Sequence, residues 1–127
     1  MREKRTHRRV SVMLPIEYWE TLDASQGGLV GNVSETGLLI YSIDGMDVGL
    51  ELKIKVSFGM GYDFDSFEAL AKIVWKDVHI ETEWKGYKYG LELVQISQKN
   101  RQKLRELLIS QQEQRLRDVV GQVADNA

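Results

Sequence analysis

The sequence contains no cysteine, and this absence removes several kinds of chemistry. Thiol catalysis, zinc sites with cysteine ligands and disulfide frameworks are all excluded. No apolar run approaches the roughly 20 residues of a membrane span. The basic first residues are not followed by the apolar core of a signal peptide, so we expect a cytoplasmic location without membrane insertion. With 127 residues, 43% hydrophobic and 28% charged, the chain is expected to form one globular domain.

Positive charge is absent from a long stretch that follows a basic start. Residues 2–9 carry five Lys or Arg and a single Glu, whereas residues 10–52 contain no Lys or Arg, and the net charge of the whole chain is −2. A short basic arm on an acidic body is typical of an anion-binding feature, because closely spaced like charges repel unless a partner neutralises them. A solvated terminus is the alternative explanation of such a run of charges.

Most of the chain alternates apolar and polar residues with the period of two that is typical of β-strands with one buried face. Pro15 removes a backbone donor, so the first strand is expected to lie at an edge or to contain a bulge. The alternation predicts strands at residues 10–19, 29–33, 37–42, 48–58, 67–75 and 87–93, with a loop at 23–28 and turns at 59–65 and 81–86.

From Ser97 onward the apolar residues follow helical spacing, as Leu104, Leu107 and Leu108 show. Ser97 is the expected N-cap, and Gly121 is expected to end the helix. Strands followed by one helix, without βαβ alternation, predict a mainly β fold in which an antiparallel barrel or sandwich carries a helix at one end. We expect a basic N-terminal arm at residues 1–9, a β-barrel at 10–96, a C-terminal helix at 97–120 and a frayed tail at 121–127.

The sequence lacks the residue patterns of common enzymes. His7 and His79 belong to no motif with metal-ligand spacing, and no nucleophile elbow, P-loop or dinucleotide fingerprint occurs. Asp63 and Asp65 lie in a predicted hairpin turn, where acidic residues more often form the turn than bind a metal. We therefore expect no catalytic activity, no metal site and no cofactor.

Two short motifs remain, and both suit a guanine nucleotide. Arg5 and Arg9 are four residues apart, a spacing that places both side chains on one side of a helix or of an extended segment. Arginine binds phosphate bidentately, pairs with the O6 and N7 edge of guanine and stacks on a base. In the segment Asn-Val-Ser-Glu-Thr-Gly, Asn32 and Ser34 offer polar groups to a base or phosphate, and Gly37 permits positive φ or close approach by a ligand. Alone, this hexapeptide is more typical of a simple polar turn.

Together, Arg5-x-x-x-Arg9 and Asn32-x-Ser34-x-x-Gly37 resemble, in order and spacing, the RxxxR and (D/N)xSxxG signature of PilZ domains, a family of bacterial receptors for cyclic di-GMP. The segments AKIVW at 71–75 and YGLEL at 89–93 are similar to the late strands of the family. The resemblance covers about residues 4–110 and implies a PilZ-type six-stranded antiparallel β-barrel with a C-terminal α-helix. It also implies that Arg5 and Arg9 contact the guanines and phosphates of cyclic di-GMP, that Asn32 and Ser34 contact a base and a phosphate, and that Gly37 is a backbone position of the site.

Four positions bear on the expected contacts to the ligand, namely Lys4, Arg8, Asn32 and Trp75. The resemblance implies that the ligand binds as an intercalated dimer or as a monomer, and the positive charge of Lys4, directly before the first motif, favours the dimer. Arg8 is expected to add a stacking or phosphate contact. The family often has Asp at the position of Asn32, and an amide offers one oxygen where a carboxylate offers two. Trp75 lies on the apolar side of its predicted strand and is expected to pack in the core rather than to stack on the ligand.

The resemblance implies a receptor in which ligand binding orders the arm over the barrel and changes the surface offered to a protein partner. Residues 115–120 are candidate contacts for that partner or for a homodimer. The alternatives are a protein-interaction adaptor with vestigial motifs and a small nucleic-acid-binding barrel. Nucleic acid is disfavoured as a partner because every charged residue in 10–52 is acidic.

Overall fold

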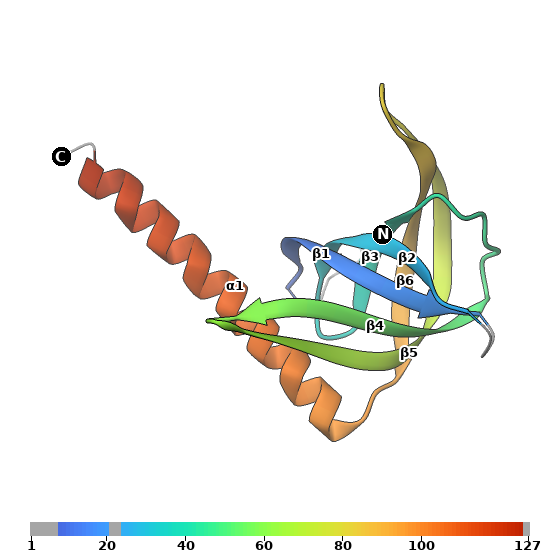
Figure 1. Ribbon diagram of the computed structural model, residues 1–127, viewed down its shortest axis with the longest axis horizontal. Coiled ribbons are helices and arrows are strands. Elements are labelled where there is room, and N and C mark those ends of the chain that lie inside the picture. The colour runs from blue at the N-terminus through green and yellow to red at the C-terminus, as the bar shows by residue number, and fades with distance from the viewer. Residues whose placement is uncertain (1–7, 21–23, 126–127) are drawn as a thin grey trace, which may run out of the picture.

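Six antiparallel strands close into a barrel in this computed structural model, which describes residues 8–20 and 24–125. The elements are β1 (Val10–Trp19), β2 (Gln26–Val33), β3 (Gly37–Ser42), β4 (Glu51–Met60), β5 (Asp63–Ile80), β6 (Lys85–Gln95) and α1 (Gln98–Asp125). Around the barrel the strand order is β1-β2-β3-β6-β5-β4, and every neighbouring pair is antiparallel (Figure 1). The mainly β class and the six-stranded barrel with a C-terminal helix are therefore confirmed.

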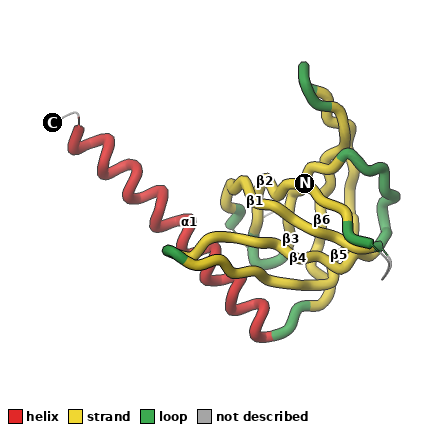
Figure 2. The backbone as a smooth tube through the Cα atoms, in the orientation of Figure 1, coloured by secondary structure: helices red, strands yellow, loops and turns green. Residues whose placement is uncertain are grey.

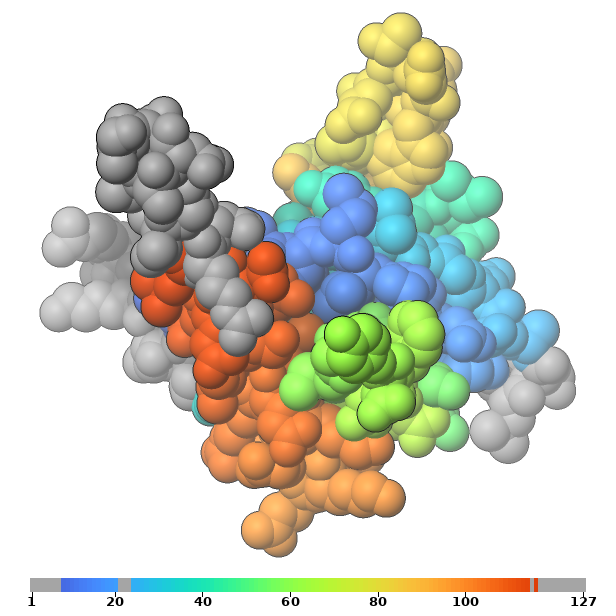
Figure 3. Space-filling view, turned by 60° about the vertical axis from the view of Figure 1, so that its left-hand side comes forward, coloured from blue at the N-terminus to red at the C-terminus, as the bar shows by residue number. Residues whose placement is uncertain are grey.

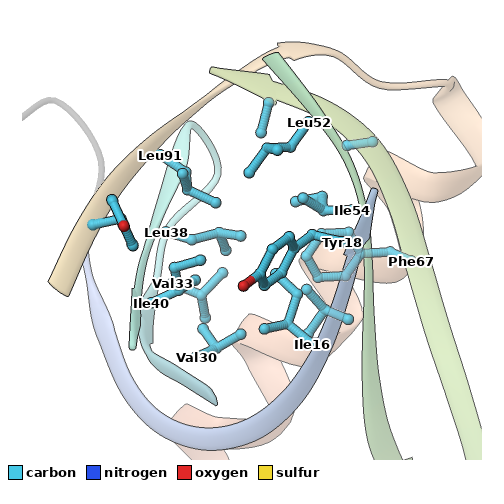
Figure 4. Packing of buried hydrophobic residues seen from close by; sticks show 14 of the residues in the cluster. Ile16, Tyr18, Val30, Val33, Leu38, Ile40, Leu52, Ile54, Phe67 and Leu91 are labelled. Atoms are coloured by element: carbon cyan, nitrogen blue, oxygen red, sulfur yellow. The ribbon is translucent and has the colours of Figure 1, made fainter. Parts of the chain in front are cut away.

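Alternation along the strands fills the barrel with apolar side chains. In β4, Leu52, Ile54, Val56 and Phe58 are buried, and the residues between them are more exposed. This is the predicted period of two, which sends successive side chains to opposite faces. Figure 4 shows how side chains from several strands meet around Tyr18 in the interior. The core therefore lies inside the barrel.

The strand predicted at 48–58 begins later than its alternation suggests. Val48 is 57% exposed, and β4 starts at Glu51. The preceding residues form a turn, in which the Leu50 N–H donates to the Asp47 carbonyl at 3.2 Å and Gly49 has a φ of 97°. A positive φ is accessible to glycine but breaks the extended backbone. The first residues of the predicted strand, including Val48, therefore lie outside β4.

Pairing between neighbouring strands continues further into the connections than the sequence suggests. β2 begins at Gln26, the β4–β5 pairing extends to Met60 and Asp63, and the β5–β6 pairing extends to Ile80 and Lys85. The expected loop at 23–28 and the expected turns at 59–65 and 81–86 are therefore shorter than predicted.

Pro15 lies close to an irregularity of β1. The register of β1 against β2 shifts between Ser11 and Leu14, so a bulge is present in this strand as predicted. On the other side of the strand, pairing with β4 begins at Ile16, one residue after the proline. Pro15 therefore lies outside the β1–β4 ladder, where its missing donor is tolerated.

The first half of α1 covers one end of the barrel. The Ser97 hydroxyl accepts a hydrogen bond from the Asn100 N–H at 3.1 Å, which confirms Ser97 as the N-cap. Leu104 and Leu107 are fully buried in the core. Lys103 forms an ion pair with Asp65 of β5 at 3.0 Å. These contacts fix the start of the helix to the barrel.

The second half of α1 projects away from the barrel (Figures 1 and 2). The helix continues to Asp125, so the prediction that Gly121 ends it is wrong, and residues 121–125 are helical rather than frayed. A glycine inside a helix costs only about 1 kcal/mol relative to alanine, which does not by itself end the helix. Leu116 is exposed along this half.

A hydrogen-bonded group ties the connection between β3 and β4 to the barrel. The Tyr18 hydroxyl contacts Ser42 Oγ and donates to Asp44 Oδ2, both at 2.5 Å. The Tyr89 hydroxyl donates to the Asp44 carbonyl at 2.6 Å and accepts from the Met46 N–H at 2.8 Å. Burial, together with the bond to Asp44, raises the pKa of Tyr18 above its usual value. The network therefore holds a protonated tyrosine at this end of the barrel.

Candidate functional site

The motif Asn-Val-Ser-Glu-Thr-Gly forms the tight turn between β2 and β3. The Ser34 N–H donates to the Gly37 carbonyl at 2.9 Å. The Ser34 hydroxyl accepts from the N–H groups of Thr36 and Gly37, each at 3.2 Å. Ser34 is only 4% exposed, because its side chain points into the turn. Its hydroxyl therefore shapes the backbone that carries the motif.

Gly37 is required by its neighbouring strand. A Cβ added at this position would lie 2.4 Å from the Leu91 carbonyl oxygen of β6, which is too close for any side chain. Among the described glycines only Gly49 and Gly61 have positive φ. Of the two alternatives expected for Gly37, positive φ is therefore not found, whereas a close approach is found and is made by β6.

Arg9 and Asn32 bring the two motifs into contact. Nη1 of Arg9 donates to Oδ1 of Asn32 at 3.3 Å. Arg9 is exposed and Asn32 is half-buried, so the guanidinium group also faces solvent. The contact places a cationic donor and a neutral amide at one point of the outer face, a combination that suits a phosphate beside a base.

The other predicted residues of the arm are distributed differently. Lys4 and Arg5 lie outside the described residues. Arg8 is exposed and lines a separate hollow next to Glu35 and α1. Arg8 and Arg9 therefore lie on two different parts of the surface around the motif turn.

Strand register places Asn32 in a row across the outer face of the barrel. Asn32 pairs with Leu39 of β3, Leu39 pairs with Gly90 of β6, and Gly90 pairs with Trp75 of β5. Neighbouring strands are about 4.8 Å apart, so the row spans about 14 Å. It leads from the polar Arg9–Asn32 contact across an apolar surface to an indole ring.

Trp75 lies on the outer face, against the expectation that it packs in the core. The register of β5 against β6 shifts between Ile73 and Trp75, and such a bulge changes the face to which the next side chains point. The indole lies over Gly90, where an added Cβ would be 2.0 Å from Nε1. Trp75 remains 37% exposed. The glycine inside the predicted last strand was the available signal for this close approach.

A larger groove of about 490 Å³ lies on the outer face near Leu29 and Tyr41. Tyr41, His79 and Trp84 contact one another in its wall, with ring centroids 5.0 to 6.2 Å apart. His79 and Trp84 belong to the β5–β6 hairpin region, which stands out from the barrel (yellow in Figure 3). The sequence pattern did not predict this groove because its wall depends on how far the hairpin extends.

Among residues 8–20 and 24–125, no group of three or more His, Cys, Asp or Glu side chains lies close enough together to hold a metal ion. In the same ranges, no helix is both long and apolar enough to cross a membrane.

Comparison with protein families gives one match that covers most of the chain. The model of the PilZ domain family matches residues 3–110. The search of curated proteins gives no match.

Solved structures with a similar fold include three proteins of low sequence identity. The inhibitor of motility MotI/DgrA of Bacillus subtilis has a TM-score of 0.71 and 18% identity, over 88% of this chain and 53% of that one. The PilZ domain of YcgR from Escherichia coli, with c-di-GMP, has a TM-score of 0.71 and 11% identity, over 92% and 98%. MrkH, a c-di-GMP-dependent transcription regulatory factor, has a TM-score of 0.66 and 9% identity, over 84% and 50%. The chain thus spans about half the length of MotI/DgrA and of MrkH.

Proposed function

This chain belongs to the PilZ domain family, and we propose that it is a receptor for cyclic di-GMP. The observation that carries the proposal is the hydrogen bond between Arg9 and Asn32, which joins the RxxxR and NxSxxG motifs at one point of the barrel surface. The similar PilZ domain of YcgR is a complex with c-di-GMP, which supports the same ligand class for this fold. PilZ domains are ligand-binding domains, so the proposed role is binding rather than catalysis.

In the proposed complex, Arg9 supplies charge and Asn32 supplies an acceptor. The guanidinium group donates to a phosphate or to the O6 and N7 edge of a guanine. The single amide oxygen of Asn32 accepts from a guanine N–H group, and it exchanges its bond to Arg9 for this bond. Arg5 acts beside Arg9 on the same ligand, and Lys4 favours the ligand dimer.

Ser34 and Gly37 act mainly by holding the motif turn in shape. The Ser34 hydroxyl accepts two backbone hydrogen bonds inside the turn, and Gly37 lets β3 lie against β6. A rigid turn fixes the position of Asn32 at the end of β2, so binding costs little conformational entropy. These two residues therefore prepare the site, and any direct contact that they make to the ligand is secondary.

Trp75 extends the proposed site at the other end of the row. Its partly exposed indole lies over Gly90, which leaves a flat aromatic surface at the outer face. Stacking of a base on such a surface contributes about 1–3 kcal/mol.

In the same proposal, the basic arm closes over the dianionic ligand once it is bound. A protein partner then recognises the changed surface.

Isothermal titration with cyclic di-GMP tests the proposed function. We expect saturable binding to the wild type, with two ligands per chain if Lys4 acts as proposed. Arg9→Ala should weaken binding by about 10- to 100-fold, because hydrogen bonds to charged groups contribute about 1.5–3 kcal/mol. GTP, titrated in parallel, should bind much more weakly than cyclic di-GMP.

A matched variant separates this effect from a general loss of positive charge. Arg117→Ala changes an arginine in the projecting half of α1 and should leave the affinity unchanged. Absence of binding to the wild type would contradict the proposal and would favour an adaptor whose motifs only shape the barrel. Steeply salt-dependent binding of unrelated DNA or RNA would instead favour a nucleic-acid-binding barrel.

A further inference from the structure

A second hollow lies beside the motif turn, on the side that faces α1. It is open to solvent and has a volume of about 360 Å³, which lies within the range of small-ligand sites. Three separate parts of the chain surround it, namely the residues around the start of β1, the β2–β3 turn and α1. The residues that line it include Arg8, Val10, Glu35, Arg105, Leu108 and Ile109.

The polar side of this hollow joins the motif turn to the helix. Nε of Arg105 lies 3.4 Å from Oε1 of Glu35. Nη1 of Arg101 donates to the Glu35 carbonyl at 3.5 Å. Glu35 lies directly after Ser34 in the motif, so a group that contacts both Glu35 and Arg105 contacts the motif turn and α1 together.

The other side of the hollow is apolar. Val10 is buried and Leu108 is half-buried, while Ile109 is 56% exposed. A flat group placed against Ile109 would remove this side chain from water, which favours binding. The hollow therefore combines an apolar wall with the carboxylate of Glu35 and the guanidinium groups of Arg8 and Arg105.

This combination matches the edges of a guanine base. Guanine presents donors at N1 and at its exocyclic amine, and acceptors at O6 and N7. A carboxylate accepts from both donors, and a guanidinium group donates to both acceptors. Adenine presents no such pair of donors. The excess of positive charge from Arg8 and Arg105 also suits a base that is linked to phosphate.

We propose that the hollow is a second guanine subsite of the receptor, in which α1 supplies Arg105 and the motif turn supplies Glu35. The inference rests on the proposed function, since its ligand is a guanine base of cyclic di-GMP. Glu35 accepts from the donor edge of the base, Arg105 donates to its acceptor edge, and Ile109 covers its face. The ligand thereby bridges the motif turn and the C-terminal helix.

The test compares cyclic di-GMP with its inosine analogue, which lacks the exocyclic amine but keeps O6 and N7. The wild type should prefer cyclic di-GMP. Glu35→Gln should weaken cyclic di-GMP binding by about tenfold, because a bidentate contact to a base discriminates by roughly tenfold or more. The ratio of the affinities for cyclic di-GMP and for the inosine analogue should fall by a similar factor. Arg105→Ala should weaken both nucleotides to the same extent, since both keep the acceptor edge.

Two further variants complete the test: one is a matched control, and the other blocks the hollow. Glu113→Gln makes the same chemical change at an exposed position of α1 outside the hollow and should change neither affinity. Ile109→Trp fills the hollow from an exposed position, so the fold should persist while both affinities fall. Thermal denaturation of each variant checks that the barrel remains folded.

The possible failures are distinguishable. If the wild type binds cyclic di-GMP while Glu35→Gln keeps its preference and Ile109→Trp keeps its affinity, the second subsite is overturned and the proposed function stands. If the wild type binds no cyclic di-GMP, the proposed function and this inference both fail.

Discussion

At the scale of single residues, two glycines set how closely other groups approach β3 and β6. A Cβ on Gly37 would meet the Leu91 carbonyl oxygen at 2.4 Å, and a Cβ on Gly90 would meet the Trp75 indole at 2.0 Å. The first obstacle is the backbone of β6, which pairs with β3 on one side and with β5 on the other and cannot move without disturbing the barrel. The second is a side chain that can rotate. Gly37 is thus a requirement of the fold, whereas Gly90 is a requirement of the outer surface where we place the ligand.

Gly37→Ala is expected to destabilise the protein, because the strands must separate to admit the methyl group. Overpacking of this kind costs about 1–3 kcal/mol. Urea denaturation of the wild type and the variant measures the difference in the free energy of unfolding. Gly59→Ala is the matched control, since no atom lies within 4 Å of its Cβ position, and it should change the stability little. Equal stability of Gly37→Ala and wild type would contradict the close approach of β3 and β6.

At the scale of elements, we expect the attachment of α1 to the barrel to weaken in acid. The hydrogen bond from Lys103 holds the pKa of Asp65 below its usual value, and the Ser66 N–H lowers it further. A carboxyl group whose pKa is lower in the folded state stabilises the fold above its unfolded pKa of about 3.9, and this stabilisation is lost as the pH falls through the folded value.

Asp65→Asn should therefore lower stability at neutral pH and have little effect in strong acid. Denaturant midpoints of wild type and variant, measured at pH 7 and at about pH 2, should differ at the first pH and converge at the second. Asp63→Asn provides a control at an exposed position of the same hairpin. A difference that is the same at both pH values would contradict a role for the ionised carboxylate.

The elements also show where sequence periodicity is informative. Alternation predicted the interior of β4 because Leu52, Ile54 and Val56 are regularly extended with one face buried. It failed where the backbone departs from regular extension. The bulge before Trp75 reversed the face of that residue, and Gly121 did not interrupt a helix whose exposed half already lies outside the barrel.

The candidate site was also only partly predictable, because part of it depends on how separate elements are placed relative to one another. The Arg9–Asn32 contact joins residues that the motifs had already singled out. The row that ends at Trp75 depends on strand register, and the hollow at Arg105 depends on where α1 packs. Neither arrangement leaves a local pattern, because the residues concerned lie on different elements.

At the scale of the whole molecule, the structure places the residues before β1 and the first half of α1 around one turn. The start of β1 brings Arg9 to Asn32 on one side of the β2–β3 turn, and α1 brings Arg105 to Glu35 on the other. The helix then projects beyond the barrel (Figure 2). A ligand bound at this turn would thus contact the basic arm and the helix at once, which gives the proposed receptor two elements through which to change its surface.

The most direct test of the account is an NMR titration of the ¹⁵N-labelled protein with cyclic di-GMP. We predict that the largest shifts occur at the amides of Asn32, Leu39 and Gly90 and at the indole N–H of Trp75, because these groups form the row beside Arg9. Shifts confined to the groove at Tyr41, His79 and Trp84, or no shifts at saturating ligand, would contradict binding at the motif turn.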